Sequence, residues 1–281
     1  TKPPKSSKLI FFGLFFLAII MSLVITSTSN PKVKDIVQLL TKSRERKSRG
    51  LCIVEGAREI NRALACGWAP LELWQLDSSS VPLNIGAFPS SYRASAKVFS
   101  KIAYRNTTEQ AVAIFRIPDV QLSTQRTLLE KARYVLVLEG IEKPGNLGAV
   151  LRSARAVGVD AVVLADPSID PFGPNVIRNA TGALFDVPLM LTTSKELRAA
   201  LSDLGFTIYI TNLHDRATSM FEMKWADKTA LVLGEEASGL SQFWNPEELE
   251  NVIIPMEGKT IDSLNVSVSA AVLMYHWKSQ Q

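Results

Sequence analysis

The chain has 281 residues, of which 47% are hydrophobic and 21% charged, with a formal net charge of +4, two cysteines and two histidines. This composition excludes a disordered chain, and two cysteines exclude a disulfide framework or a four-thiolate zinc site. Because His214 and His276 lie far apart and no paired cysteine spacing is present, we predict no metal. The length is sufficient for two modest domains.

The positive charge is concentrated near the N-terminus. Residues 1–29 carry three Lys and no acid, residues 30–62 carry nine basic and four acidic residues, and residues 63–281 carry 19 basic and 23 acidic residues. Most of the chain is therefore mildly acidic. We expect a polyanion, if one binds, to meet the segment 30–62.

A hydrophobic segment, residues 1–29, opens the chain. Its core, residues 9–25, is a run of 17 uncharged residues that follows Lys2, Lys5 and Lys8. As a helix it would measure about 26 Å, at the short end of what spans a bilayer. Three interpretations stay open: a membrane anchor, a cleaved signal segment, or sequence upstream of the true start. We expect a cytoplasmic protein, or, if residues 9–25 span a membrane, a body on the cytoplasmic side, where more Lys and Arg lie.

Residues 30–117 are predicted to form a small α/β domain, and the polar, non-periodic residues that follow predict a linker at 118–133. Apolar residues at helical spacing indicate an amphipathic helix at the start of this domain. The predicted elements, in order, are this helix ending at Gly50, a strand at 51–54, a helix at 59–67, a strand at 71–77, a helix at 94–103 and a strand at 111–117.

Strands and helices alternate regularly through residues 134–281. Apolar strands without polar alternation, interleaved with helices, predict an α/β domain with a parallel sheet that helices cover on both faces. The predicted strands are YVLVLEG, AVVLAD, TIYITNL, TALVLGEE and NVIIPME, and the predicted helices are NLGAVLRSARAVG, KELRAALSDLG and NVSVSAAVLMYHW.

Three glycine-bearing loops follow strands of this second domain, at 139–148, 231–240 and 253–271. Ligands of parallel α/β sheets bind at such strand ends. Each loop also has a structural explanation as a turn, with Asn146, and Ser263 or Asn265, serving as helix caps. The chain has neither GxGxxG nor GxxxxGK[ST], so a dinucleotide fingerprint and a P-loop are excluded.

Taken together, NLGAVLRSARAVG, LVLGEEASGL and IPMEGKTIDSLNVSVSAA resemble the three motifs of the SpoU/TrmH family of RNA ribose 2′-O-methyltransferases, in the family's order. The resemblance covers residues 134–281. NPKVKDIVQLL and VEGAREINRAL resemble the substrate-binding domain found ahead of it in many members. DPFGPNVIRNATGALFDVPL is similar to a family segment around an arginine, here Arg178, with Thr181 where Ser is common.

The resemblance implies a deep trefoil knot at the C-terminal end, S-adenosylmethionine bound within the knot, a homodimer, and RNA as the partner. The implied positions around S-adenosylmethionine are Leu233, Gly234, Ile254, Met256 and Leu264. The implied polar active-site positions are Asn146, Arg152, Glu236, Ser263 and Asn265. For RNA contact we predict Lys42, Arg44, Arg46, Lys47 and Arg178.

The expected activity is methyl transfer to a ribose 2′-hydroxyl, with 23S-type ribosomal RNA favoured over transfer RNA. Because a guanidinium stays protonated at ordinary pH, we expect Arg152 to position the hydroxyl and stabilise developing negative charge, with a role as base left open. The alternatives are a transfer RNA methyltransferase, a methyltransferase acting on a base nitrogen, and a non-catalytic RNA-binding or assembly protein. Membrane contact is expected only if the hydrophobic segment belongs to the mature protein.

Overall fold

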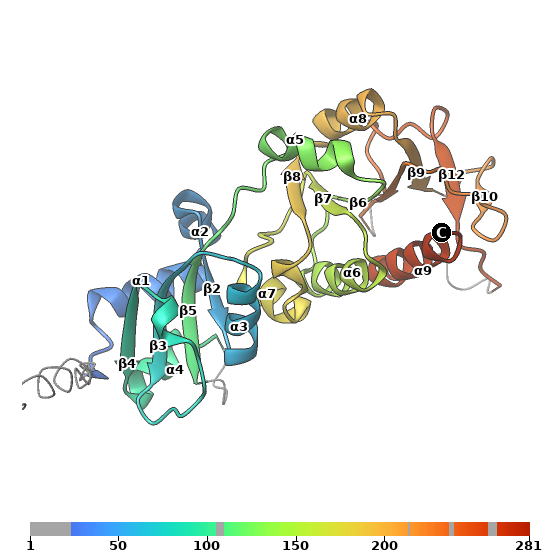
Figure 1. Ribbon diagram of the computed structural model, residues 1–281. Helices are drawn as coiled ribbons and strands as arrows, with labels where there is room; N and C mark the ends of the chain where they lie inside the picture. The colour runs from blue at the N-terminus through green and yellow to red at the C-terminus, as the bar shows by residue number, and fades with distance from the viewer. Residues whose placement is uncertain (1–23, 105–109, 213, 236–238, 258–262) are drawn as a thin grey trace, which may run out of the picture.

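The computed structural model describes residues 24–104, 110–212, 214–235, 239–257 and 263–281. These residues form two α/β domains arranged one after the other along the chain, each built on its own sheet (Figure 1).

The first domain is a five-stranded mixed sheet in the order β1-β4-β3-β5-β2. Its strands are β1 Val24–Ile25, β2 Leu51–Glu55, β3 Pro70–Leu76, β4 Ser90–Ala94 and β5 Ala111–Arg116. Its helices are α1 Pro31–Thr41, α2 Ser43–Arg49, α3 Ala57–Ala65 and α4 Ala96–Ile102, with a short 3-10 turn, η1, at Ile85–Ala87.

The alternation of side chains along β2 divides the core of this domain between the two sheet faces. Ile53 packs in a cluster with the apolar sides of α1 and α4, whereas Cys52 and Val54 face a cluster that includes Ile60 of α3. The second cluster continues without a break into the other domain. The two domains therefore share one apolar core across their junction.

The second domain is a seven-stranded sheet in the order β10-β12-β9-β11-β6-β7-β8, and every recorded strand pair in it is parallel. Its strands are β6 Tyr134–Glu139, β7 Ala161–Ala165, β8 Leu189–Thr192, β9 Thr207–Thr211, β10 Thr218–Ser219, β11 Thr229–Leu233 and β12 Glu250–Ile253. Its helices are α5 Leu122–Lys131, α6 Pro144–Val157, α7 Pro174–Ala180, α8 Ser194–Asp203 and α9 Val266–Ser279, with a 3-10 turn, η2, at Ala183–Phe185.

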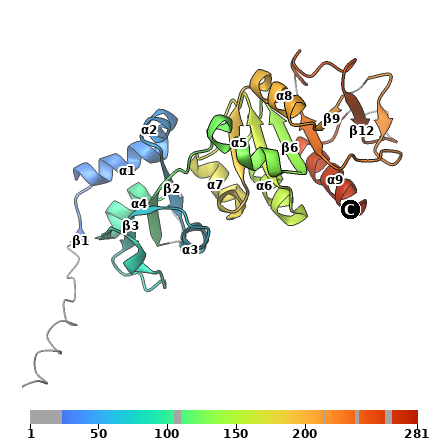
Figure 2. The same ribbon diagram turned by 45° about the horizontal axis from the view of Figure 1, so that its top comes forward.

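Helices cover both faces of the second sheet, as the sequence predicts. Figures 1 and 2 show α6 and α9 along one face and α5 and α8 along the other. The central strands β6, β7 and β11 are buried on both sides, which explains why their sequences are continuously apolar. The trefoil knot stays a prediction.

Polar contacts also join the two domains. Arg46 of α2 forms an ion pair of 2.6 Å with Asp170, and both side chains are less than 10% exposed. Trp68 donates a hydrogen bond of 3.2 Å to the carbonyl oxygen of Phe185 and packs edge-on against its ring. The α2 and α3 side of the first domain is thus fastened to the segment around α7.

The structure differs from the predicted elements in several places. The predicted opening helix is two helices, because Lys42 is extended between α1 and α2. The predicted linker at 118–133 contains α5, whose Leu122 and Leu129 are buried against the second sheet. The short α7, β4 and β8 were not predicted, because elements of four to seven residues give little periodic signal.

The hydrophobic segment lies mostly outside the described residues. Its last part is described, and there Val24 and Ile25 pair with β4 as part of the first sheet. Within the described part of the chain, no helix is both long and apolar enough to cross a membrane.

Candidate functional site

A cavity of about 200 Å³ lies at the carboxyl edge of the second sheet, where β9, β11 and β12 end and α9 begins. Three strand ends and one helix start converge there, as expected for a ligand site in a parallel α/β sheet. The lining residues are Thr211, Asn212, Leu233, Gly234, Glu235, Gly239, Val252, Ile253, Ile254, Met256, Ser263, Leu264, Val266 and Ser269. We call this cavity the strand-end pocket.

All five positions predicted around the cofactor line the strand-end pocket: Leu233, Gly234, Ile254, Met256 and Leu264. Gly234 has a steric requirement as well, because a Cβ added there would lie 2.4 Å from the carbonyl oxygen of Gly239. The chain folds back over the end of β11 at this point. A side chain at position 234 would open that turn.

A second cavity of about 180 Å³ adjoins the first and shares with it Leu233, Gly234, Glu235 and Val266. Asn146 lines this second cavity. It lies inside α6, whose N-cap is Lys143, so its predicted role as helix cap is wrong. Asn265, at the N-cap of α9, donates a hydrogen bond of 3.1 Å from Nδ2 to Oδ1 of Asn146 and accepts one from the backbone of Ser267.

The buried carboxylate of Glu139, at the end of β6, organises the wall of the second cavity. Oε1 accepts hydrogen bonds from Ser194 Oγ, from Ser241 Oγ at 2.7 Å and from Trp244 Nε1 at 2.9 Å. Oε2 accepts one from the backbone N–H of Ser241 at 2.7 Å. A single carboxylate thus ties α8 and the segment after the β11 loop to the strand end.

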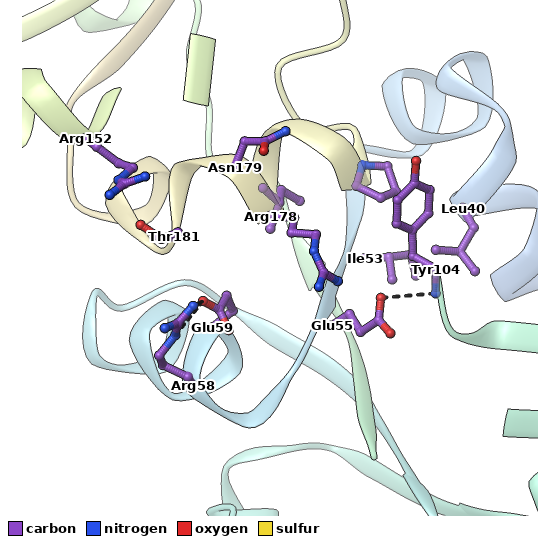
Figure 3. A pocket seen from close by; sticks show the side chains of 12 residues that line it. Leu40, Ile53, Glu55, Arg58, Glu59, Tyr104, Arg152, Arg178, Asn179 and Thr181 are labelled. Atoms are coloured by element: carbon purple, nitrogen blue, oxygen red, sulfur yellow. Dashed lines mark hydrogen bonds and ion pairs between the residues drawn. The ribbon is translucent and has the colours of Figure 1, made fainter. Parts of the chain in front are cut away.

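A third cavity, of about 260 Å³, lies between the domains, and Figure 3 shows its side chains. Arg152 of α6 and Arg178 of α7 line it from the second domain. The first domain contributes Glu55, Glu59 and Tyr104, among others. We call it the interdomain cavity. It shares no lining residue with the strand-end pocket.

Three of the five predicted active-site positions, Asn146, Ser263 and Asn265, line the two sheet-edge cavities or bridge to them. Arg152 does not join them, because it lies about 9 Å further along α6, on a different side of the helix. Glu236 lies outside the described residues. Thr211, Asn212 and Glu139 were given no role, although their positions at strand ends would have indicated them.

The structure corrects one of the predicted RNA contacts. Arg46 is 5% exposed, bound to Asp170 and to the carbonyl oxygens of Leu39 and Leu40, so its charge is used inside the protein. Its neighbours Lys42, Arg44 and Lys47 are exposed. Arg178 is half-buried in the interdomain cavity. Among the described residues, no group of three or more His, Cys, Asp or Glu side chains is placed to hold a metal ion.

Two family models match the chain. The SpoU rRNA methylase family matches residues 133–275, and the MRM3-like substrate binding domain matches residues 30–113. Among curated relatives, the 23S rRNA (guanosine(2553)-2′-O)-methyltransferase RlmP of Bacillus subtilis is 32% identical, over 90% of this chain and 98% of its own length. An uncharacterized tRNA/rRNA methyltransferase of Synechocystis is 30% identical, over 92% and 94%.

Solved structures are similar over the same length. An RNA 2′-O ribose methyltransferase superposes with a TM-score of 0.74 at 34% identity, covering 92% of this chain and 99% of that one. An AdoMet-bound rRNA methyltransferase from Sinorhizobium meliloti has a TM-score of 0.81 at 25% identity, covering 91% and 97%.

Proposed function

The chain belongs to the SpoU rRNA methylase family, and from this premise we propose that it transfers a methyl group from S-adenosylmethionine to a ribose 2′-hydroxyl of RNA, with 23S-type ribosomal RNA as the substrate. The observation that carries the proposal is the strand-end pocket, whose lining includes Leu233, Gly234, Ile254, Met256 and Leu264. The proposed location, the cytoplasm, follows from the RNA substrate.

The strand-end pocket suits S-adenosylmethionine. Leu233, Ile254 and Leu264 provide apolar surface for the adenine and the methionine stem, and loop backbone groups between them provide hydrogen-bonding partners. At Gly234 the backbone of Gly239 approaches so closely that position 234 has no room for a side chain. When bound, S-adenosylmethionine supplies an electrophilic methyl group on a sulfonium.

The polar groups on the other side of Leu233 and Gly234 suit the acceptor. Asn146 and Asn265 hold each other at 3.1 Å, which fixes the orientation of two side-chain amides beside the pocket. We propose that these amides orient the ribose. Arg152 then positions the 2′-hydroxyl and stabilises the negative charge that develops on its oxygen while the proton passes to bulk water, because a guanidinium donates hydrogen bonds but is a poor base.

We expect Arg152→Ala to lower methyl transfer at least about a hundredfold, within the range measured for lost oxyanion donors, while S-adenosylmethionine binds normally. Calorimetry measures the binding, and incorporation of labelled methyl into RNA measures the transfer. Arg198→Ala, which removes a cation from α8, is the matched control and should transfer at the normal rate. Normal turnover by Arg152→Ala would contradict either role for this arginine.

The placement of Arg152 supports the proposed homodimer. Within one chain it lines a different cavity from the cofactor positions. Val268 and Tyr275 of α9 lie seven residues apart, so they share a helix face, and they are 47% and 54% exposed. We propose that a second copy packs against this face and that its Arg152 completes the site.

Mixed dimers test this arrangement. Arg152→Ala and Gly234→Ala chains are mixed and allowed to exchange. The mixture is assayed at an S-adenosylmethionine concentration too low to fill the Gly234→Ala pocket, so that each variant alone transfers methyl groups poorly. A heterodimer regains one working site if arginine and cofactor pocket come from different chains, and none if they come from the same chain. Recovery of methyl transfer to a measurable fraction of the wild-type rate supports the shared site, and no recovery contradicts it.

The exposed residues Lys42, Arg44 and Lys47 are proposed to contact RNA phosphates. Such contacts set position and not sequence, and each one makes affinity more dependent on salt. Replacing all three by alanine should lower the slope of log affinity against log salt by about two, at roughly 0.7 per phosphate of single-stranded RNA. An unchanged slope would show that these residues do not contact RNA phosphates and only face solvent.

A further inference from the structure

We propose that the interdomain cavity is a nucleotide-binding subsite, which holds the phosphate of a nucleotide next to the target against Arg178 and its base against Tyr104. The inference rests on the proposed function, because it takes the ligand to be single-stranded RNA that continues from the methylated nucleotide. It assigns a role to Tyr104, which neither the motifs nor the basic N-terminal segment indicated.

The charged side chains on the two walls of the cavity differ in the partners they have. On the first-domain wall, Glu59 forms an ion pair of 2.7 Å with Arg58, and Glu55 accepts a hydrogen bond of 3.1 Å from the backbone N–H of Tyr104. On the second-domain wall, neither Arg152 nor Arg178 forms an ion pair or side-chain hydrogen bond with any residue that the structure describes. Among the described residues, the guanidinium donors of Arg152 and Arg178 in this cavity are therefore unused.

Arg178 is the more informative of the two. It is half-buried in the last turn of α7, where the helix dipole favours a cation, yet its side chain extends across the cavity toward the first domain (Figure 3). A partly desolvated cation without an anionic partner is costly to keep. A phosphate in the cavity would satisfy it, because the planar fork of a guanidinium matches two phosphate oxygens.

Tyr104 supplies the second contact. Tyr104 is 37% exposed and lines the same cavity, with its ring facing α7 across the domain junction (Figure 3). An exposed aromatic ring beside a phosphate site is the usual platform for a base of single-stranded RNA. The cavity, at about 260 Å³, is smaller than the roughly 300–1,000 Å³ that encloses a whole drug-sized ligand, so it suits one unit of a longer chain.

Both domains are needed to form this subsite, and the junction holds them together. The Arg46–Asp170 pair and the contacts of Trp68 fix the first domain against the α7 segment. Arg152, proposed to act on the reacting ribose, lines the same cavity as Arg178. A nucleotide held here would therefore lie beside the target nucleotide on the same strand.

The test measures the binding of a labelled single-stranded RNA oligonucleotide to the full chain by fluorescence anisotropy, over a range of salt concentrations. Arg178→Ala should raise Kd about tenfold and lower the salt slope by about 0.7, the value for one phosphate contact on a single strand. Tyr104→Ala should raise Kd roughly five- to a hundredfold with an unchanged slope, and Tyr104→Phe should bind as the wild type does.

The matched control is Arg198→Ala, which removes an equal charge from α8, where Arg198 lies 3.8 Å from Glu248. It should change neither Kd nor slope. Thermal melting and S-adenosylmethionine affinity show that each variant folds. Wild-type binding by Arg178→Ala or by Tyr104→Ala would overturn the two-contact subsite.

Methylation assays separate this inference from the proposed function. If the wild type methylates no RNA although both variants bind RNA more weakly, the proposed function fails and the subsite stands. If the wild type methylates RNA and both variants bind it normally, the subsite fails and the proposed function stands.

Discussion

At the scale of single residues, Gly234 connects backbone geometry to cofactor binding. The chain folds back so closely over the end of β11 that the Gly239 carbonyl oxygen lies 2.4 Å from where a Cβ at position 234 would be. The same two glycines line the strand-end pocket. The shape of the pocket therefore depends on the absence of one methyl group.

We predict that Gly234→Ala weakens S-adenosylmethionine binding at least tenfold, equal to about 1.4 kcal/mol, and destabilises the protein by about 1–3 kcal/mol through overpacking. Calorimetry and urea unfolding measure the two effects. Gly145→Ala is the control, because an added Cβ at Gly145 meets nothing within 4 Å and the residue lies in α6. Equal cofactor affinity in both variants would show that the turn does not shape the pocket.

Glu139 has a comparable role for the neighbouring wall. Glutamine in its place exchanges one acceptor oxygen for an NH₂ group that faces existing donors. We predict that Glu139→Gln lowers the free energy of unfolding by about 1–3 kcal/mol, because at least one buried donor loses its acceptor. Glu142→Gln, an exposed change three residues further on, should stay within about 0.5 kcal/mol of the wild type in urea unfolding. Equal stability of the two variants would contradict this account.

At the scale of elements, the sequence was most informative where helices and strands are long and apolar. The buried strands β6, β7 and β11 and the helices α6 and α9 could be predicted from hydrophobic runs, and the strand-end rule located the pocket. Which side chains pair with each other, and which site residues lie apart in space, could not be predicted. Arginine is usually a surface residue, but Arg46 is buried against Asp170. The two residues lie 124 positions apart, so their pairing could not be predicted from the sequence.

Helix α9 also carries a predicted pH response at its last turn. His276 Nδ1 accepts a hydrogen bond of 3.0 Å from Trp225 Nε1, which requires an unprotonated nitrogen, and burial lowers the pKa of His276 below its usual 6.5. The unfolded chain therefore takes up a proton that the folded chain resists. The contribution of this contact to stability is complete above the unfolded pKa and is lost as pH falls through the folded pKa.

We predict that the wild type loses more stability than His276→Gln when pH falls from about 7 to about 5, the range in which histidine titrates. Glutamine offers Trp225 an acceptor that cannot be protonated. Urea unfolding followed by tryptophan fluorescence at both pH values measures the difference. Parallel pH dependence in the two proteins would exclude His276 as the cause.

At the scale of the whole molecule, the domain junction explains how a basic N-terminal domain can serve a site on the second sheet. One apolar cluster runs through both domains, and the buried Arg46–Asp170 pair crosses between them. Leaving one of two buried charges without its partner is costly, so this contact disfavours other arrangements of the domains. The interdomain cavity depends on that arrangement.

We predict that Arg46→Met destabilises the protein by about 3–5 kcal/mol, because it leaves Asp170 buried without a counter-charge. The double variant Arg46→Met with Asp170→Leu should recover most of that loss. Urea unfolding of the three proteins provides the measurement. If Arg46→Met instead unfolds like the wild type and only weakens RNA binding, the arginine is an RNA contact after all.

The most direct test of the central claim is a map of 2′-O-methyl groups across total RNA from cells with and without the gene. If the protein is a ribose 2′-O-methyltransferase, we expect one or a few 2′-O-methyl groups of 23S-type ribosomal RNA to be missing in cells without the gene. These groups should return with the wild-type gene but not with the Arg152→Ala variant. If no ribose methyl group is lost, or if the lost methyl group was on a base nitrogen, the claim is contradicted.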